Sequence, residues 1–329
     1  MDYNTGHATS QPIGDEVILR DTLIHTDTLV GSRSNDLSDE EINCFKTQGF
    51  VVKRGLVDDQ VTFARVIDHV WNNVPRSIMQ RDNPDSWIDK PHEEWTEEDH
   101  EHVGLLAYGN WKMRSRGKDG IGTEPFLVDR IANHANIRAV VGTLMGLPVQ
   151  PVRRVRGIYC VFPKPPQAEA RYGPHADYMA AQLTAMVVAD SIPPHAGGFT
   201  VWPGSHLRLH MHWDTVFGGT ICTEKSDGYR QERDAILREV APVELTGEAG
   251  DVIFWHPRLL HSAGVNHSSE WDKPLVRVIV PCDYQKDDLT YYDDHEFGPG
   301  PDYQWWVDTR NFREDVAPTR GNVWSNWAI

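Results

Sequence analysis

A succession of strand-forming segments and glycine turns between residues 173 and 280 decides the fold. It opens with Gly173-Pro174-His175-Ala176-Asp177-Tyr178, continues with Gly197-Gly198-Phe199-Thr200-Val201-Trp202-Pro203-Gly204-Ser205-His206 and Gly250-Asp251-Val252-Ile253-Phe254-Trp255-His256-Pro257-Arg258-Leu259-Leu260-His261, and closes with Leu275-Val276-Arg277-Val278-Ile279-Val280. Short runs of β-branched and aromatic residues bounded by Gly, Pro and Asp are typical of strands joined by turns. The stretch therefore predicts a mainly β core.

His175 and Asp177 are the first candidates for a metal site. They are two residues apart, so on an extended strand both side chains leave the same face. A third ligand has to come from another strand, and His261, which follows the strand-like run 252–255, is well placed to supply it. Two histidines and one carboxylate occupy one triangular face of an octahedral metal ion and leave the other positions open. His256 is the nearest rival to His261 as the third ligand.

Arg277 is the candidate for binding an anion. On a strand it shares a face with Leu275 and Ile279, so the pattern directs its side chain inward. A lone arginine on an apolar face needs an anionic partner, and a carboxylate bound through both oxygens suits its planar fork best. The pattern favours a dicarboxylate held by Arg277 beside the metal.

Each of these features has a plainer explanation when it is taken alone. A histidine near an acid is common on protein surfaces, His261 is compatible with an ordinary core histidine, and Arg277 is compatible with a buried ion pair. The order of the features along the chain outweighs these explanations, because HxD, a glycine-rich turn, strand–His and strand–Arg follow one another in β-rich sequence. The separation of the two histidines, 261 − 175 = 86 residues, leaves room for several short strands.

These residues resemble the catalytic core of the phytanoyl-CoA dioxygenase family of iron(II)/2-oxoglutarate-dependent oxygenases. The shared features are His175-Ala176-Asp177, the stretch 198–206 that ends in Pro-Gly-Ser-His, Gly250-Asp251 leading to His261, and the arginine in Leu-Val-Arg-Val. The resemblance covers most of residues 38–280. The spacing from His261 to Arg277 is a few residues longer than is usual in the family, which we interpret as a longer hairpin loop.

The resemblance implies a double-stranded β-helix (a jelly roll, cupin-like) with helices packed outside one sheet. It implies an enzyme that uses iron(II), 2-oxoglutarate and O2, oxidises a C–H bond and releases succinate and CO2. An acid at position 177 argues for hydroxylation, desaturation or ring closure rather than halogenation. The residues implied for the site are the catalytic metal ligands His175, Asp177 and His261 and the co-substrate contacts Arg277, Ser262, Lys164 and Tyr159.

The substrate is less constrained than the chemistry. An acyl-CoA would need a basic rim, which Arg153, Arg154, Arg156 and the basic group Arg114–Lys118 are placed to provide, but the net charge of −16 does not favour this choice. We therefore expect a small natural-product or lipid-like metabolite. A redox-neutral metal-binding cupin and a non-catalytic binding module are the alternatives from other classes.

The composition excludes some partners and predicts a compartment. Forty per cent hydrophobic residues, among them twelve tryptophans, indicate a globular protein. The net charge of −16 disfavours nucleic acid and anionic membranes, which are bound by clustered Lys and Arg. The sequence shows no signal peptide and no apolar run long enough for a membrane span, and its four cysteines have no CxxC spacing. We expect a cytoplasmic protein with reduced cysteines.

The chain is expected to form a single domain, residues 1–329. Residues 1–37 are expected to be an irregular arm, 38–150 a mostly helical support, 151–282 the jelly-roll core, and 283–329 a C-terminal wrap or a contact in a homo-oligomer. A capping box at Ser38 and Glu41 predicts a helix that ends at Gly49, and Asp58 or Asp59 begins a second one. The apolar spacing over 124–145 predicts a further helix.

Overall fold

The computed structural model describes residues 24–25, 34–74, 79–88, 110–114, 120–145, 149–166, 172–177, 183–209 and 227–284. The helices are α2 (Asp39–Gln48), α3 (Gln60–Asn73), α4 (Asp85–Ile88), η3 (Ile121–Thr123), α6 (Pro125–Leu127), the π-helix η4 (Val128–Ala132), α7 (Ala135–Met145), α8 (Ser205–Leu209), α9 (Asp227–Glu239) and η7 (Ser268–Glu270). The strands are β1 (Ile24–His25), β2 (Phe50–Lys53), β3 (Asn110–Arg114), β4 (Gly157–Val161), β5 (Leu183–Val188), β6 (Phe199–Val201), β7 (Val243–Leu245), β8 (Val252–Trp255), β9 (His261–Ala263) and β10 (Arg277–Tyr284).

Two sheets form the centre of the described structure. The strand order is β1-β7-β6-β9 in the four-stranded sheet and β2-β8-β5-β10-β4-β3 in the six-stranded one. All pairs are antiparallel except β1 with β7. The protein is therefore mixed in content, with helices flanking antiparallel sheets.

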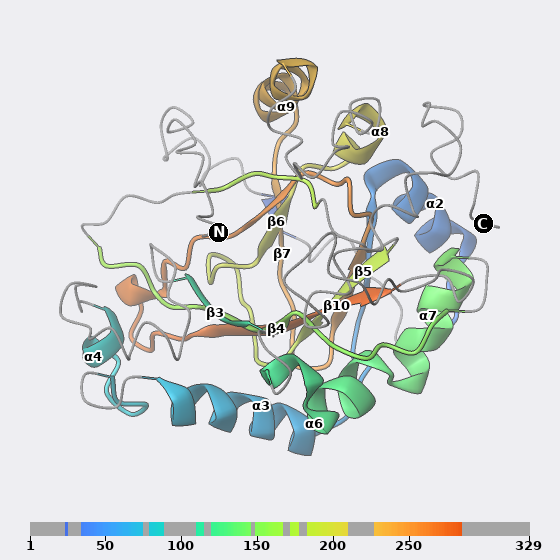
Figure 1. Cartoon of the computed structure of the whole chain (residues 1–329). Coiled ribbons are helices and arrows are strands. Elements are labelled where there is room, and N and C mark those ends of the chain that lie inside the picture. Colours follow the sequence, from blue (N-terminus) through green and yellow to red (C-terminus); the bar gives the residue numbers. More distant parts are fainter. Residues whose placement is uncertain are drawn as a thin grey trace, which may run out of the picture.

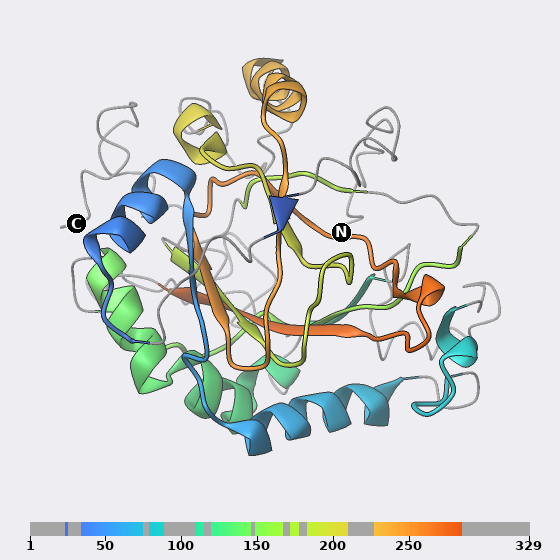
Figure 2. The ribbon, with the colours of Figure 1, turned by 180° about the vertical axis from the view of Figure 1, so that it is seen from behind.

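Alternation along the strands of the six-stranded sheet divides the core into two layers. On β8, Ile253 and Trp255 join an apolar cluster with residues of β6 and β7, so this cluster lies between the sheets. Val252 and Phe254 point the other way and pack with residues of α3 and α7. Figures 1 and 2 show α3, α6 and α7 along one side of the molecule, with α8 and α9 at the opposite end.

The first helix begins and ends as the sequence predicts. Ser38 accepts a hydrogen bond from the amide of Glu41, whose carboxylate accepts one from the amide of Ser38. The helix stops at Gly49, which has a φ of 87° and lies against the ring of His206. The next helix, α3, is capped by Asp59, whose carboxylate accepts from the amide and hydroxyl of Thr62. The helical support of the sheet is thus built from local signals.

The prediction of one helix over 124–145 is wrong in its middle. The helical path is broken at Asn133 and His134, between η4 and α7. The side-chain oxygen of Asn133 accepts from the amide of Val152 at 2.9 Å, and its amide group donates to the Val152 carbonyl at 2.8 Å. Asn133 therefore pairs with the segment that leads into β4 instead of sitting inside a continuous helix.

The segment between His261 and Arg277 is not a hairpin loop, as the sequence suggested. β9 belongs to the four-stranded sheet and β10 to the six-stranded sheet, so the segment crosses from one sheet to the other. Asn266 fixes its path, because its side-chain amide donates to the carbonyls of Val161 at 3.0 Å and Leu275 at 2.8 Å.

Several expectations fall partly or wholly outside the described residues. Within the arm 1–37, residues 24–25 form β1, which differs from the irregular path expected there. The C-terminal segment 285–329 and much of 75–119 lie outside the described part of the chain. Cys44, Cys160 and Cys282 are free thiols, as expected for three of the four cysteines. In the described ranges, each helix is too short or too polar to cross a bilayer.

Candidate metal centre

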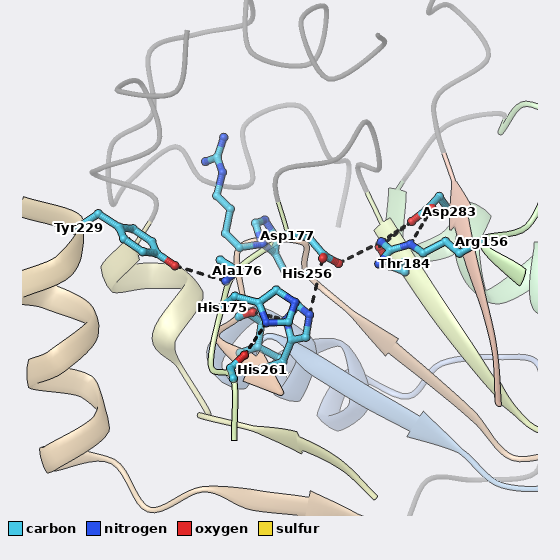
Figure 3. Close-up of polar contacts among 12 residues, drawn as sticks. Arg156, His175, Ala176, Asp177, Thr184, Tyr229, His256, His261 and Asp283 are labelled. Atoms are coloured by element: carbon cyan, nitrogen blue, oxygen red, sulfur yellow. Dashed lines mark hydrogen bonds and ion pairs between the residues drawn. The ribbon is translucent and has the colours of Figure 1, made fainter. Parts of the chain in front are cut away.

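His175, Asp177 and His261 converge on one point in space. Their potential ligand atoms all lie within 4.8 Å of one another, and they form the single group of this kind among the described residues. Nε2 of His261 is 3.6 Å from Oδ1 of Asp177, and the two imidazole rings are 4.5 Å apart between centroids. Figure 3 shows the three side chains directed toward one another. The spacing predicted from the sequence thus yields a compact set of two nitrogens and one oxygen.

The main chain holds the two histidines side by side. His175 and His261 form an isolated antiparallel bridge in which each amide donates to the other's carbonyl at 2.9 Å. The amide of Asp177 donates to the carbonyl of Pro257 at 2.8 Å. The amide of Ala176, between the two ligands, donates to the hydroxyl of Tyr229 on α9 at 3.3 Å. The segment 172–177 is therefore tied to the strand that carries the third ligand.

Both imidazole rings are oriented for coordination through Nε2. Nδ1 of His175 lies 2.6 Å from the carbonyl of Gly173, and Nδ1 of His261 lies 2.8 Å from the carbonyl of Leu259. A carbonyl only accepts, so each Nδ1 carries the hydrogen, and the lone pair of a neutral ring is on Nε2. A metal-bound histidine characteristically donates its second ring hydrogen to such a group.

A buried ion-pair network surrounds the carboxylate of Asp177. Nη2 of Arg156 donates to Oδ2 of Asp177 at 2.9 Å, while Oδ1 faces His261. The same guanidinium donates to both carboxylate oxygens of Asp283 on β10, at 2.6 and 2.8 Å. Burial by itself would raise the pKa of Asp177, but the charge of Arg156, aided by His261 and His175, lowers it well below its usual value. Asp177 is thus ionised, as a metal ligand must be.

His261 is neutral over the whole physiological pH range. Burial lowers its pKa to about 3, although the neighbouring Asp177 acts in the opposite direction. Its ring packs 5.0 Å from that of Phe199 and 5.8 Å from that of Trp255. A neutral imidazole in an apolar surrounding binds a cation without first having to lose a proton.

Arg277 is buried and forms no ion pair with the described residues. Its side chain is 3 % exposed and lies on the inner face of β10, the face it shares with Ile279, as predicted. Nη1 donates to the carbonyl of Gly197 at 3.0 Å, and Nε has no partner. Burial lowers the pKa of Arg277 to about 10, although the nearby Cys160 and Glu244 act in the opposite direction. This cation fits a carboxylate ligand.

The other predicted co-substrate contacts lie in different surroundings. Tyr159 is opposite Ile279 in the β4–β10 ladder and packs on the apolar cluster between the sheets. Ser262 accepts from the amide of Gly173 at 2.9 Å and donates to the carbonyl of Ala263 at 2.9 Å, so its hydroxyl is bonded to the main chain. Lys164 is buried, and its amine lies 3.4 Å from the carbonyl of Pro165. The structure brings Tyr159 closest to the face that carries Arg277.

The rival ligand His256 is not a member of the group that could hold a metal ion. Nδ1 of its ring accepts from the amide of Arg258 at 3.1 Å, and the ring packs 5.2 Å from that of His206. His206 in turn contacts the carbonyl of Lys46 on α2 through Nε2, at 3.0 Å. These two histidines join α2 and α8 to the sheets.

Arg156 is the site residue that the sequence assigned to a different role. The sequence suggests a place for it with Arg153 and Arg154 in a basic rim for an acyl-CoA, but its side chain is buried and bound to Asp177 and Asp283. Its position directly before the buried strand 157–161 was the one local sign that its side chain is buried. Its two acidic partners are 21 and 127 residues away, so no local pattern pointed to them.

The sequence also matches the model of a known protein family. The model described as phytanoyl-CoA dioxygenase (PhyH) matches residues 45–273, well over half of the chain. The chain belongs to the phytanoyl-CoA dioxygenase family. The protein is therefore a 2-oxoglutarate-dependent non-haem iron oxygenase, and its cofactors are iron(II), 2-oxoglutarate and dioxygen. The family match covers all three candidate ligands but ends four residues before Arg277.

Solved structures show a related fold at low sequence identity. The carbocyclase SnoK of nogalamycin biosynthesis is 18% identical, with 83% of this chain and 91% of that chain covered and a TM-score of 0.50. The apo form of EctD from S. alaskensis is 16% identical, with 83% and 85% covered and a TM-score of 0.48. HygX from Streptomyces hygroscopicus, solved with nickel and 2-oxoglutarate, is 12% identical, with 80% and 94% covered and a TM-score of 0.45. No curated protein sequence matches the chain.

Proposed function

We propose that His175, Asp177 and His261 bind the iron(II) of this family member and that Arg277 binds the far carboxylate of 2-oxoglutarate. One combined observation carries the proposal. A two-histidine, one-carboxylate group with both Nε2 atoms turned inward shares the space between the sheets with a buried arginine that forms no ion pair within the described residues and whose Nε has no hydrogen-bond partner there. A divalent metal ion suits the three ligand atoms, and a carboxylate of a dicarboxylate ligand suits the guanidinium of the arginine.

The proposed reaction oxidises a C–H bond of a small organic molecule. Bound iron(II) with 2-oxoglutarate and dioxygen supplies the oxidising power, so that R–H, O2 and 2-oxoglutarate yield R–OH, succinate and CO2. The carbonyls of Gly173 and Leu259 orient the two imidazoles, and Arg156 holds the carboxylate of Asp177. Phe199 and Trp255 pack beside His261, where apolar rings help exclude water.

We also propose that the two sheets form a double-stranded β-helix within a single domain. From β4 onward the chain alternates between the sheets: β4 and β5 lie in the larger, β6 and β7 in the smaller, β8 in the larger, β9 in the smaller and β10 in the larger. Two facing antiparallel sheets that exchange strands in this way are the pattern of a jelly roll. Residues 24–25 attach the N-terminal arm to the edge of the smaller sheet.

The proposed substrate is a small, apolar or amphipathic metabolite rather than an acyl-CoA. Burial of Arg156 in its ion pairs removes one of the three arginines that would have formed a rim for the phosphates of coenzyme A. The net charge of −16 is also unfavourable for a polyanionic substrate. Phosphate-rich substrates then depend on Arg153 and Arg154, which are partly or fully exposed.

The test of the cofactor assignment is an anaerobic titration of the iron(II)-loaded protein, followed through the visible charge-transfer band of the 2-oxoglutarate chelate. We expect 2-oxoglutarate to bind at least 30-fold more tightly than 2-oxobutanoate, which keeps the chelating end and lacks the far carboxylate. A fully desolvated charge pair contributes about 2 kcal/mol or more, which corresponds to roughly that factor. Arg277→Ala should abolish the preference between the two ligands.

Arg208→Ala is the matched control. It likewise removes an arginine side chain. Arg208 lies on α8, and its guanidinium pairs with the carboxylates of Glu232 and Glu239 on α9. This variant should keep the preference for 2-oxoglutarate. Absence of the band in a well-loaded wild type would overturn the proposal in favour of a redox-neutral metal site. An unchanged preference in Arg277→Ala would refute the role of Arg277 alone.

A further inference from the structure

The buried network around Arg156 is larger than a structural ion pair requires. One guanidinium contacts three side chains that come from different parts of the fold: Asp177 on the ligand segment, Asp283 at the end of β10, and Thr184 on β5, whose hydroxyl is 3.4 Å away. Arg156 itself is 7 % exposed and Asp177 is 3 % exposed. Burying charged groups carries a desolvation cost, which their attraction offsets only where the geometry is good and the remaining polar atoms are hydrogen-bonded.

The two oxygens of Asp177 have separate partners. Oδ2 is 2.9 Å from Nη2 of Arg156, and Oδ1 is the oxygen that faces Nε2 of His261 at 3.6 Å. The carboxylate is therefore held with one oxygen turned to the metal group and the other turned away. From these contacts we infer that Arg156 is a positioning residue that restricts Asp177 to one-oxygen coordination of the metal; this inference rests on the metal assignment proposed above.

Restricting Asp177 in this way keeps coordination positions available. A carboxylate that is free to turn can bind a divalent metal through both oxygens and occupy one more position of the octahedron. Two histidine nitrogens and one carboxylate oxygen leave three positions for the chelating co-substrate and dioxygen. Arg156 thus protects the third open position without touching the metal itself.

Asp283 explains how a positive charge is tolerated beside a cation site. Arg156 paired with Asp177 alone would cancel the charge of the ligand carboxylate and weaken its attraction for a divalent metal. Asp283 contributes a second carboxylate to the same guanidinium, through Nε and Nη2. The three side chains together keep one excess negative charge. Since Asp283 accepts from two nitrogens of Arg156, it also fixes the plane of the guanidinium.

The register of β10 links this network to the co-substrate end of the site. Arg277 and Asp283 are six residues apart on the same strand, so both side chains leave its inner face, separated by about 20 Å of strand. Arg277 is paired with Val161 of β4 and Asp283 with Thr184 of β5. One strand therefore sets the position of the anion-binding arginine and of the acid that anchors Arg156.

Cobalt(II) binding to the full-length, metal-free protein tests the inference, because the intensity and position of its visible absorption report the coordination number. Arg156→Lys keeps the charge but replaces the planar fork by a compact ammonium on a flexible stem, which cannot hold the two carboxylates in the same fixed geometry. We expect it to weaken cobalt(II) binding by about 10- to 100-fold, the usual effect of losing a partner of a metal ligand, and to shift the visible spectrum. Spectrum and affinity within threefold of wild type, in a folded variant, would overturn the inference.

Arg54→Lys is the matched control. Nη1 of Arg54 is 2.7 Å from Oδ2 of Asp251, which is a similar arginine–aspartate pair without contact to the metal ligands. It should lower the thermal stability and leave the cobalt(II) spectrum unchanged. If it shifts the spectrum as far as Arg156→Lys does, the effect is one of general stability and the inference is refuted.

A second variant covers the case in which Arg156→Lys does not fold. Asp283→Asn keeps the shape and an acceptor but removes the second carboxylate that fixes the guanidinium, so we expect a several-fold loss of cobalt(II) affinity with a spectral shift in the same direction. A spectrum like that of wild type would argue against the role of Arg156. Failure of the underlying metal assignment looks different, because His261→Ala would then bind cobalt(II) as well as wild type does.

Discussion

A neutral imidazole buried beside an ionised carboxylate makes the stability of the metal-free protein depend on pH. The pKa of His261 is lowered by burial to about 3, whereas the ordinary value is 6.5. The unfolded chain therefore binds more protons than the folded one between these values. It follows that stability associated with His261 is present above about pH 6.5 and is lost as the pH falls toward about 3.

This dependence gives a prediction for a single residue. In the presence of a chelator, the unfolding free energy of wild type should fall between pH 6.5 and 5, with a contribution from His261 of up to about 1.4 kcal/mol per pH unit. His261→Asn removes the titrating ring, so its free energy of unfolding should vary less over this interval. Urea titrations at several pH values measure both slopes. Parallel curves for the two proteins would show that His261 titrates normally.

At the scale of single residues, the sequence indicated the ligands but not the groups that hold them. The spacing of His175 and Asp177 and the alternation around Arg277 are local patterns, and the structure places these side chains as expected. Arg156 became part of the site only through Asp177 and Asp283, which are distant in sequence. Contacts between distant residues leave no periodic signal, so its role was not predictable.

Among the elements, the turn before β8 depends most strictly on one residue type. Gly250 has a φ of 95°, and a Cβ atom there would lie 2.2 Å from the carbonyl oxygen of Val57. Gly250→Ala should therefore destabilise the protein by about 2 kcal/mol or more, from backbone strain and displacement of Val57 together. The measurement is the midpoint of urea unfolding at neutral pH.

Gly142→Ala provides the comparison for that turn. Gly142 lies inside α7 with no atom within 4 Å of the added carbon, so alanine should stabilise the helix by about 0.5–1 kcal/mol. Opposite signs for the two substitutions are the expected result. A mild effect at Gly250 would mean that the turn can adopt another conformation.

The ends of elements were predicted correctly where the signal lies in residues close in sequence. The predictions failed where the ends depend on distant residues. The cap of α2 and its end at Gly49 involve residues close in sequence, and both were expected. The break at Asn133 depends on Val152, and the path of 264–276 depends on which sheet each strand joins. These two interpretations were wrong because their causes lie in tertiary pairing.

At the scale of the whole molecule, the described structure has two apolar layers, and one of them contacts the candidate site. The layer between the six-stranded sheet and the helices contains Phe254, and the layer between the sheets contains Phe199, which contacts His261. The sequence predicted a mainly β protein with flanking helices; the described residues confirm the antiparallel sheets and the flanking helices, but the content is mixed rather than mainly β. The assignment of faces was not, because β8 is buried on both sides and shows no alternation of apolar and polar residues.

This arrangement predicts different effects for two similar substitutions. Phe254→Leu and Phe199→Leu should each lower the free energy of unfolding, by on the order of 1 kcal/mol. Only Phe199→Leu should also change the cobalt(II) spectrum, because its ring packs 5.0 Å from that of His261. Urea unfolding measures the loss of stability in each variant, and visible absorption measures the cobalt(II) spectrum. An equal spectral change in Phe254→Leu would mean that the layers are not independent.

The main-chain bridge between His175 and His261 has a kinetic consequence. Two ligands share one pair of reciprocal amide–carbonyl hydrogen bonds, so a local opening of that pair separates both imidazoles from a bound ion at the same moment. The residence time of the metal and the hydrogen–deuterium exchange of the two amides then depend on the same fluctuation. If these two histidines bind the metal as proposed, we expect the ion to be retained for as long as this short stretch of backbone stays closed.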